Sequence, residues 1–295
     1  MTQFLQLLFE GISQGFTYAL IALGFSVIFR ASRVLNFAQG AMLLVSAYVV
    51  SALAVDVGLP FPIAVLLAVL VVGVGAIAVH RLLLRRLGSD DVFAGVMITL
   101  GLGTLLTAGV DAFFGGDTRI LGDPWGASAV DVGGVTLTWI KIWGIIVALI
   151  AVSAFFALDR YTRAGTAMRA TAEREEAALA CGVPVRRIQG IAWGVAGLLA
   201  VLGGIFLSGF PQAVAPAVGE AAFLAFPAIV IGGLDSPVGA LIGGLLIGLV
   251  QVLSAGYIPN ALGANFGSVA PYVAMILILF VKPYGLFGTT PAVRL

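Results

Sequence analysis

Residues 189–208 read QGIAWGVAGLLAVLGGIFLS, an apolar run without a charged side chain. About 20 apolar residues of helix are needed to cross the hydrocarbon core of a bilayer. Further runs of this kind occupy residues 9–29, 36–55, 61–80, 92–111, 139–158, 219–233, 238–255 and 268–281. The sequence therefore predicts an all-α fold, a polytopic transmembrane bundle of about eight or nine helices.

The composition supports a membrane location for these runs. Hydrophobic residues make up 61% of the 295-residue chain and charged residues only 10%. A soluble protein of this length would need many more polar side chains to cover its surface, whereas lipid is a favourable solvent for apolar ones. We therefore interpret residues 1–295 as a single transmembrane domain.

Two of the runs are less regular than the others. The run at 9–29 has Glu10 and Gln14 in its opening turns, and the run at 219–233 is short and holds Pro227. Broken or re-entrant helices are tolerated where protein shields their backbone from lipid. The number of full spans is therefore left open between eight and nine.

The basic residues indicate an orientation, because Lys and Arg near helix ends concentrate on the cytoplasmic side of a membrane. With nine spans and an outer N-terminus, all 15 Lys and Arg residues except Arg119 and Lys141 fall on the inner side. The C-terminus is then predicted to be cytoplasmic. The long outer connection at 112–138 contains an alternating stretch, 130–137, that is compatible with a short hairpin.

The ionisable residues disfavour chemistry inside the membrane. The acidic residues nearest to the apolar runs lie at predicted span ends or in loops. They are Glu10, Asp56, Asp111, Glu220 and Asp235. Proton-coupled transporters and voltage sensors normally carry a charge within a span. One cysteine, Cys181, and one histidine, His80, offer neither a metal site nor a nucleophile–base pair. We expect no enzyme, no cofactor and no nucleic-acid partner, and any energy for transport to come from another chain.

Residues 159–190 are by far the most polar stretch, DRYTRAGTAMRATAEREEAALACGVPVRRIQG. Residues 166–180 are rich in helix formers and lack Gly and Pro, so a helix is predicted there. Gly182 suits the left-handed residue that ends a helix, and Pro184 suits the first turn of a new one. The segment is therefore predicted to be a cytoplasmic helix–turn–helix; the alternative is a solvated charged loop.

The order of residues in this segment resembles a known coupling element. Glu176, Ala177 and Ala178, followed after three residues by Gly182, resemble the EAA loop of ABC importer permeases. Other stretches extend the resemblance: YALIALG at 18–24, VLNFAQG at 34–40, GGLDSPVGALIGG at 232–244 and KPYGLFG at 282–288. Together they resemble the branched-chain amino-acid ABC permeases of the LivH type over residues 9–288.

The resemblance implies a division of labour. A second homologous permease chain would enclose the path with this one, an extracytoplasmic solute-binding protein would deliver the solute, and two cytoplasmic ATP-binding subunits would supply the energy. The chain would lie in a bacterial inner membrane. The residues expected to couple it to the ATPases are Glu173, Glu176, Ala177, Ala178, Gly182 and Pro184.

The predicted substrate is a branched-chain, hydrophobic amino acid. Relatives often carry His where this chain has Gln39, an acidic residue at Ala41 and Glu at Gln251. Because of these departures, import of urea or a short amide is kept as the alternative. A passive small-solute channel and a scaffold subunit without a path are rivals from other classes, and neither needs the segment at 159–190.

Polar and small residues in the runs give candidate path and packing sites. Asn36 and Gln39 are three apart, so they are predicted to share a helix face, where they would line the path or bond another helix. Weaker path candidates of the same kind are Gln14, Thr99, Thr104 and Gln251. Small residues four apart let membrane helices approach closely, which predicts packing roles for Gly239, Gly243, Gly244 and Gly248.

Overall fold

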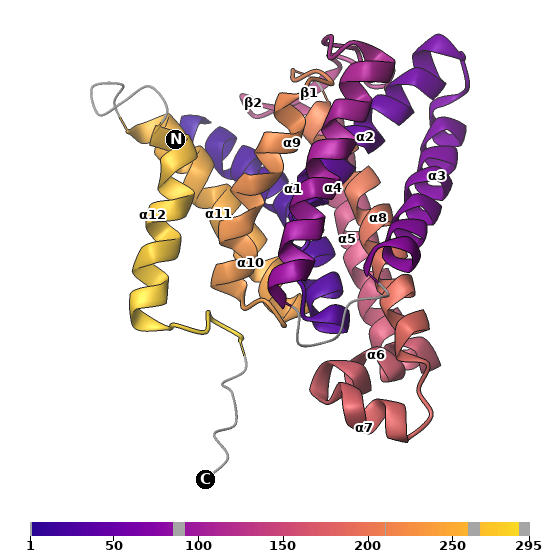
Figure 1. Cartoon of the computed structure of the whole chain (residues 1–295). Helices are drawn as coiled ribbons and strands as arrows, with labels where there is room; N and C mark the ends of the chain where they lie inside the picture. The colour runs from indigo at the N-terminus through magenta and orange to yellow at the C-terminus, as the bar shows by residue number, and fades with distance from the viewer. Residues whose placement is uncertain (1, 85–91, 210, 259–265, 289–295) are drawn as a thin grey trace.

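The computed structural model describes residues 2–84, 92–209, 211–258 and 266–288 (Figure 1). Its long helices are α1 (Thr2–Ser32), α2 (Gln39–Ser51), α3 (Phe61–Leu82), α4 (Val92–Phe114), α5 (Trp139–Tyr161), α8 (Val185–Ser208), α11 (Pro237–Tyr257) and α12 (Phe266–Val281). Its short helices are α6 (Arg163–Glu173), α7 (Glu175–Ala180), α9 (Ala217–Ala221) and α10 (Phe226–Gly232). The remaining elements are a π-helical turn at Ala52–Asp56, a 3-10 turn at Ala222–Ala225, and strands β1 (Ala129–Val132) and β2 (Val135–Thr138), which pair antiparallel.

Within the described residues, seven helices are long and apolar enough to cross a membrane. They are α1, α2 with its π-helical extension, α3, α4, α5, α8 and α11. Two shorter apolar segments, Ala217–Gly232 and Phe266–Val281, accompany them in the described part of the chain. The predicted all-α polytopic bundle is confirmed, but two of its predicted spans are shorter than a standard crossing.

The irregularity predicted for residues 219–233 is confirmed. The 3-10 turn at Ala222–Ala225 separates α9 from α10, and Pro227 lies in the first turn of α10. A proline there removes no helical hydrogen bond, because the first N–H groups of a helix have no partner within it. By contrast α1, the other run expected to be irregular, is an unbroken helix of 31 residues.

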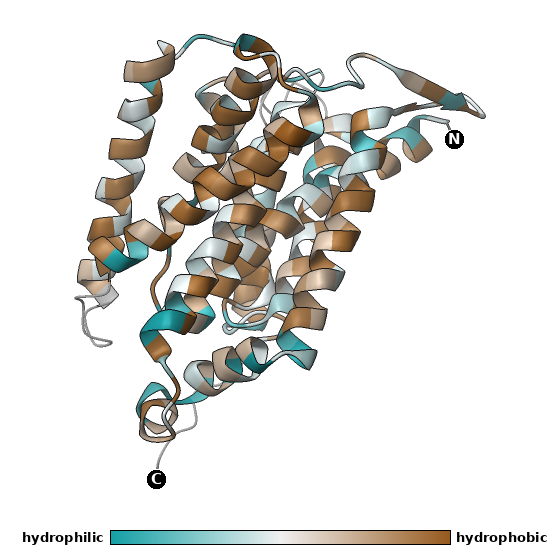
Figure 2. Ribbon diagram, turned by 90° about the vertical axis from the view of Figure 1, so that its right-hand side faces the viewer, coloured by the Kyte–Doolittle hydropathy of each residue, from teal (hydrophilic) through white to brown (hydrophobic). Residues whose placement is uncertain are grey.

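The helices run between two ends of the molecule (Figure 1). The hairpin end carries β1, β2 and the start of α1, where the Gln6 amide exchanges hydrogen bonds with the backbone of Thr136. The opposite end is formed by α6 and α7, and we call it the α6/α7 end. Hydrophobic residues cover the long helices, and hydrophilic ones gather mainly toward the ends (Figure 2).

Basic residues are distributed unequally between these ends. The described ones at or next to the α6/α7 end are Arg30, Arg33, Arg81, Arg160, Arg163, Arg169, Arg174, Arg186, Arg187 and Lys282. Arg119 and Lys141 lie at the hairpin end, where each pairs with a carboxylate. The basic residues thus gather at one end of the bundle, as the predicted alternation of the runs requires.

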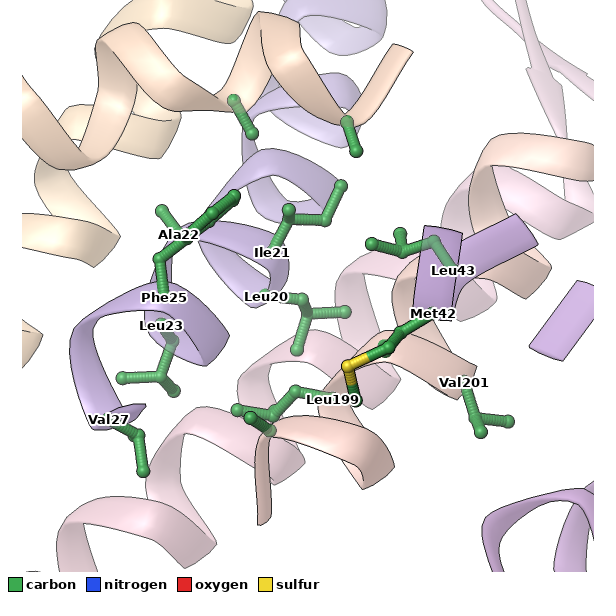
Figure 3. Packing of buried hydrophobic residues seen from close by; sticks show 14 of the residues in the cluster. Leu20, Ile21, Ala22, Leu23, Phe25, Val27, Met42, Leu43, Leu199 and Val201 are labelled. Atoms are coloured by element: carbon green, nitrogen blue, oxygen red, sulfur yellow. The ribbon is translucent and has the colours of Figure 1, made fainter. Parts of the chain in front are cut away.

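α1 is the central helix of the bundle. It packs along α11, α8 and α5, and 78% of its apolar window is buried, against 22% for α3 and α4. Leu20 and Leu23 of α1, Met42 of α2 and Leu199 of α8 belong to one buried cluster (Figure 3). Since α1 has almost no face left for lipid, any movement of it must displace its neighbours.

Close contact between α11 and α1 depends on glycine. A Cβ on Gly248 would lie 2.3 Å from both N and Cα of Gly15, and a Cβ on Gly244 would lie 2.5 Å from N of Ala19. These neighbours are backbone atoms, which cannot turn aside as a side chain can. The two helices therefore meet backbone to backbone, as small residues permit in membranes.

Two further glycines of α11 face α10. A Cβ on Gly239 would lie 2.1 Å from O of Gly232, and a Cβ on Gly243 would lie 2.0 Å from O of Ala228. Ser236 starts α11 by accepting a hydrogen bond from N of Gly239 at 3.0 Å. The glycine-rich stretch thus forms the start of α11 and holds it against two helices.

Candidate coupling site and polar groove

α6 starts directly where α5 ends. Thr162 accepts a hydrogen bond from N of Gly165 at 3.0 Å, which caps the new helix. A Cβ on Gly165 would lie 2.3 Å from O of Asp159, so only glycine fits inside this sharp turn. The chain therefore leaves α5 at a fixed angle and carries α6 beneath the bundle (Figure 1).

The single helix predicted over 166–180 is wrong. Arg174 has an extended backbone, with φ −151° and ψ 106°, and it divides the segment into α6 and α7. Residue propensities miss this break, because Arg174 is itself a good helix former. Glu175 and Glu176 occupy the first turn of α7, where carboxylates suit the positive end of the helix dipole.

α7 ends in a Schellman motif. N of Val183 donates to O of Ala178 and N of Gly182 donates to O of Leu179, both at 2.9 Å. Gly182 has φ +81°, a conformation that glycine adopts without steric cost. Gly182 thus ends the helix, as its position in the sequence predicts.

The second helix of the predicted helix–turn–helix is not a separate element. Pro184 immediately precedes α8, and Val185 and Ile188 are buried in the first turns of that membrane-spanning helix. The apolar positions that were assigned to a short cytoplasmic helix therefore anchor the base of a span. α7 is therefore joined to α8 by only four residues, 181–184.

α7 lies at the far tip of the α6/α7 end (Figure 1). Of the six residues expected to couple to ATPases, only Ala178 is buried; the exposed ones are Glu173, Glu176, Ala177, Gly182 and Pro184. Leu179 is 53% exposed beside them. The tip therefore offers acidic groups around a small apolar surface, a composition suited to docking another protein.

The end of α1 holds α6 in place. The Arg33 guanidinium donates to the backbone O of Ala172, near the C-terminus of α6. The Asp159 carboxylate lies 3.5 Å from the Arg30 guanidinium and 3.4 Å from that of Arg169. These contacts join the central helix to α5 and α6 at the base of the bundle.

Replacing Arg33 with alanine should loosen α6. The variant loses a charge-assisted hydrogen bond and a cation at the negative end of a helix, together worth about 1 kcal/mol at an exposed position. Amide hydrogen exchange in residues 163–173 should become about fivefold faster. Arg163→Ala, an exposed arginine at the other end of α6, is the control, and equal exchange in both variants would contradict the clamp.

The two conspicuous amides do not share a helix face. Asn36 lies in the turn before α2, where its side-chain O accepts from N of Ala38 at 3.1 Å, while Gln39 is the first residue of α2. The Asn36 amide donates to the Gln39 side-chain O at 3.2 Å, and both side chains are fully buried. The turn results from the Asn36 side chain bonding its own backbone, which competes with helix.

The two threonines differ in environment. Thr99 of α4 is fully buried; its hydroxyl donates to O of Leu35 at 3.2 Å and accepts from N of Phe37 at 3.3 Å, so it fixes the turn before α2. Thr104 bonds O of Leu100 in its own helix and is exposed. Asn36, Gln39 and Thr99 thus form one buried polar cluster between helices.

Gln14 and Gln251 come together in a groove of about 420 Å³ near the hairpin end. Gln251 of α11 accepts a hydrogen bond from the Tyr18 hydroxyl at 2.6 Å. Glu10 lies in the same groove, 3.3 Å from the ammonium of Lys141 in α5. Glu10 was placed at a span end by its sequence, yet it is the ninth residue of α1, past the first two turns.

The described residues contain no group of three or more His, Cys, Asp or Glu side chains that could hold a metal ion. His80, to which the sequence assigned no role, is buried at the end of α3 with its ring 6.4 Å from that of Trp193. Its Nε2 lies 3.4 Å from the Gln189 side-chain O.

A family model described as the permease component of branched-chain amino acid transport systems matches residues 7–281. The chain belongs to this permease family. It is 29% identical over 300 aligned residues to the high-affinity branched-chain amino acid permease LivH of Escherichia coli K12, with 97% of this chain and 96% of the relative covered. It is 30% identical to a probable LivH of Methanocaldococcus jannaschii, with 91% and 88% covered.

Two further matches have lower coverage or lower identity. A nucleoside ABC transporter permease of Lactococcus lactis, NupC, is 28% identical over 157 residues, 50% of this chain and 48% of that protein. Among solved structures, PsaBC of Streptococcus pneumoniae is 15% identical, with 96% of this chain and 93% of that chain covered at a TM-score of 0.48.

Sequence reasoning missed several contacts of this permease. Arg33 and Ala172 are 139 positions apart, and the Glu10–Lys141 pair joins α1 to α5. The only available signal was that Lys141 is one of two basic residues on the predicted outer side. Glu10 is an acidic residue at the same end of the bundle, where the two charges can pair.

Proposed function

We propose that this permease translocates branched-chain amino acids into the cell, driven by separate ATPase subunits that bind α7. The observation that carries the proposal is the protruding α7, with Glu176 and Leu179 exposed at its surface. Its family and its LivH relatives support the substrate class. The chain itself has no G-x-x-x-x-G-K-[ST] phosphate loop, so ATP would be hydrolysed by partner chains.

The geometry suggests how force would reach the membrane. The ATPases would move α7, and α7 continues through a short turn into α8. α6 would carry the same movement to α1 through Arg33 and the Asp159 pairs. Since α1 and α11 meet backbone to backbone, they would move together as a largely rigid body, which is how many transporters alternate access.

The arrangement of partners follows from the two ends. The α6/α7 end would face the cytoplasm, because it holds most of the described basic residues. The C-terminus would then also be cytoplasmic, as the charge asymmetry of the sequence predicts. The solute-binding protein would dock at the hairpin end. A second homologous permease chain would enclose the path together with this one.

Uptake by the reconstituted complex tests the proposal. Labelled leucine and valine should accumulate in proteoliposomes only when the binding protein is outside and ATP is inside. Accumulation of urea without leucine would keep the importer class and change the substrate. Equal flux with and without ATP would contradict the importer and favour a passive channel.

A further inference from the structure

We infer that the groove between α1, α5 and α11 is a binding site for a zwitterionic, apolar amino acid, with Lys141 facing its carboxylate and Glu10 its ammonium. The inference rests on the proposed function and adds a location and a mode of recognition. The groove has a volume of about 420 Å³, within the range of small-molecule sites. It lies near the hairpin end, where solute would arrive.

The groove has a charged part and an apolar part. Its polar lining includes Glu10, Ser13, Gln14, Lys141 and Gln251. Its apolar lining includes Leu7, Ile140, Phe206 and Val252. An amino acid with a branched side chain has the same two parts, a charged end and an apolar end.

The charged part is a pair of opposite charges. The Lys141 ammonium lies 3.3 Å from the Glu10 carboxylate, and the Gln6 amide donates to the same carboxylate oxygen at 2.9 Å. Both charged side chains are about one-third exposed, at 28% and 33%. Both are therefore held in position by neighbours and remain accessible to a solute.

The Glu10–Lys141 ion pair adds little to the stability of the fold. A partly exposed pair contributes only about 0–1 kcal/mol to stability. α1 is already fixed by Gly15 and Ala19 against α11, and by Arg30 and Arg33 at its other end. Binding of a charged solute therefore explains the Glu10–Lys141 pair better than a structural role in joining α1 to α5.

A zwitterion can replace this pair without leaving a charge alone. Its carboxylate takes the place of Glu10 beside Lys141, and its ammonium takes the place of Lys141 beside Glu10. Because the Tyr18 hydroxyl already occupies the Gln251 side-chain O, the Gln251 amide N–H groups remain as donors for the carboxylate. Neutral urea gains no ion pair in this exchange, so the groove favours an amino acid over an amide.

Protection of an introduced thiol tests the site in the assembled complex. Val252→Cys places a thiol on the apolar wall, and its reaction with a neutral maleimide is followed by peptide mass spectrometry. The rate of modification at position 252 without added solute is the reference. Leucine should slow modification at position 252 by the factor 1 + [L]/Kd, about fivefold at roughly four times Kd. Leucinamide and isocaproate, each lacking one charge, and urea should protect far less.

Charge variants then test the roles of the two residues. Lys141→Met should abolish protection by leucine, and the exchange Glu10→Lys with Lys141→Glu should restore part of it. Arg119→Met, which breaks the ion pair with Asp56 at the same end outside the groove, should leave protection unchanged. Loss of protection in Arg119→Met as well would overturn the assignment of charges to this groove.

The result separates this inference from the function on which it rests. If leucine gives no protection while the Val252→Cys complex still imports leucine with ATP, the groove is not the site and the importer stands. If ATP-dependent leucine uptake is absent even in the unmodified complex, the proposed function itself is contradicted. Protection by leucine and urea alike would overturn recognition of a zwitterion.

Discussion

Replacing Gly248 with leucine should abolish the accumulation of folded permease. The new Cβ would lie 2.3 Å from N and Cα of Gly15, a separation that real Cβ atoms essentially never show. Overpacking costs about 1–3 kcal/mol where side chains can rearrange. Here the obstruction is the backbone of the most buried helix, so α11 and α1 would have to separate along their contact.

The matched control is Gly75→Leu in α3. Gly75 is exposed, and a Cβ there would meet nothing within 4 Å, so the same change should be tolerated. Both variants are compared as fluorescent fusions by size-exclusion chromatography of detergent-solubilised membranes. A monodisperse Gly248→Leu peak at the unmodified level would show that the two helices are not packed as described. Equal loss in both variants would make glycine itself, and not its position, responsible.

The elements that sequence predicted well are those fixed by local chemistry. Hydrophobic runs located the long helices, and Pro227 with a short run predicted the break before α10. Gly182 has the left-handed φ expected of a residue that ends a helix. The alternating stretch at 130–137 forms the hairpin of β1 and β2. In each case a few neighbouring residues determine the result.

The features that sequence missed depend on distant or competing contacts. Arg174 is extended although its propensity favours helix, and Asn36 leaves the helix because its side chain bonds its own backbone. Glu10 and Lys141 meet only because α1 and α5 pack together. Nothing within a local window encodes a pairing across 131 positions, so the candidate groove became visible only in the folded chain.

Replacing Glu176 with arginine should abolish ATP-driven uptake while leaving the permease folded. Glu176 is exposed in the first turn of α7, at the tip of the α6/α7 end. Charge reversal at a docking surface puts like charges together, which costs several kcal/mol. A loss of about 3 kcal/mol lowers the affinity for the ATPase more than about 100-fold. The measurements are co-purification of the ATPase subunit and leucine uptake in proteoliposomes.

Two comparisons separate docking from damage to α7 itself. Glu176→Gln removes the charge without reversing it and should retain partial uptake, whereas Asp131→Arg, at an exposed acid of β1 in the hairpin end, should leave ATPase co-purification unchanged. Gly182→Pro attacks the same element differently: proline cannot adopt φ +81° or donate to O of Leu179, so the end of α7 is lost. If Glu176→Arg and Gly182→Pro both retained ATPase and normal uptake, α7 would not be the coupling element. Force would then have to enter the bundle by another route than α6 and α8.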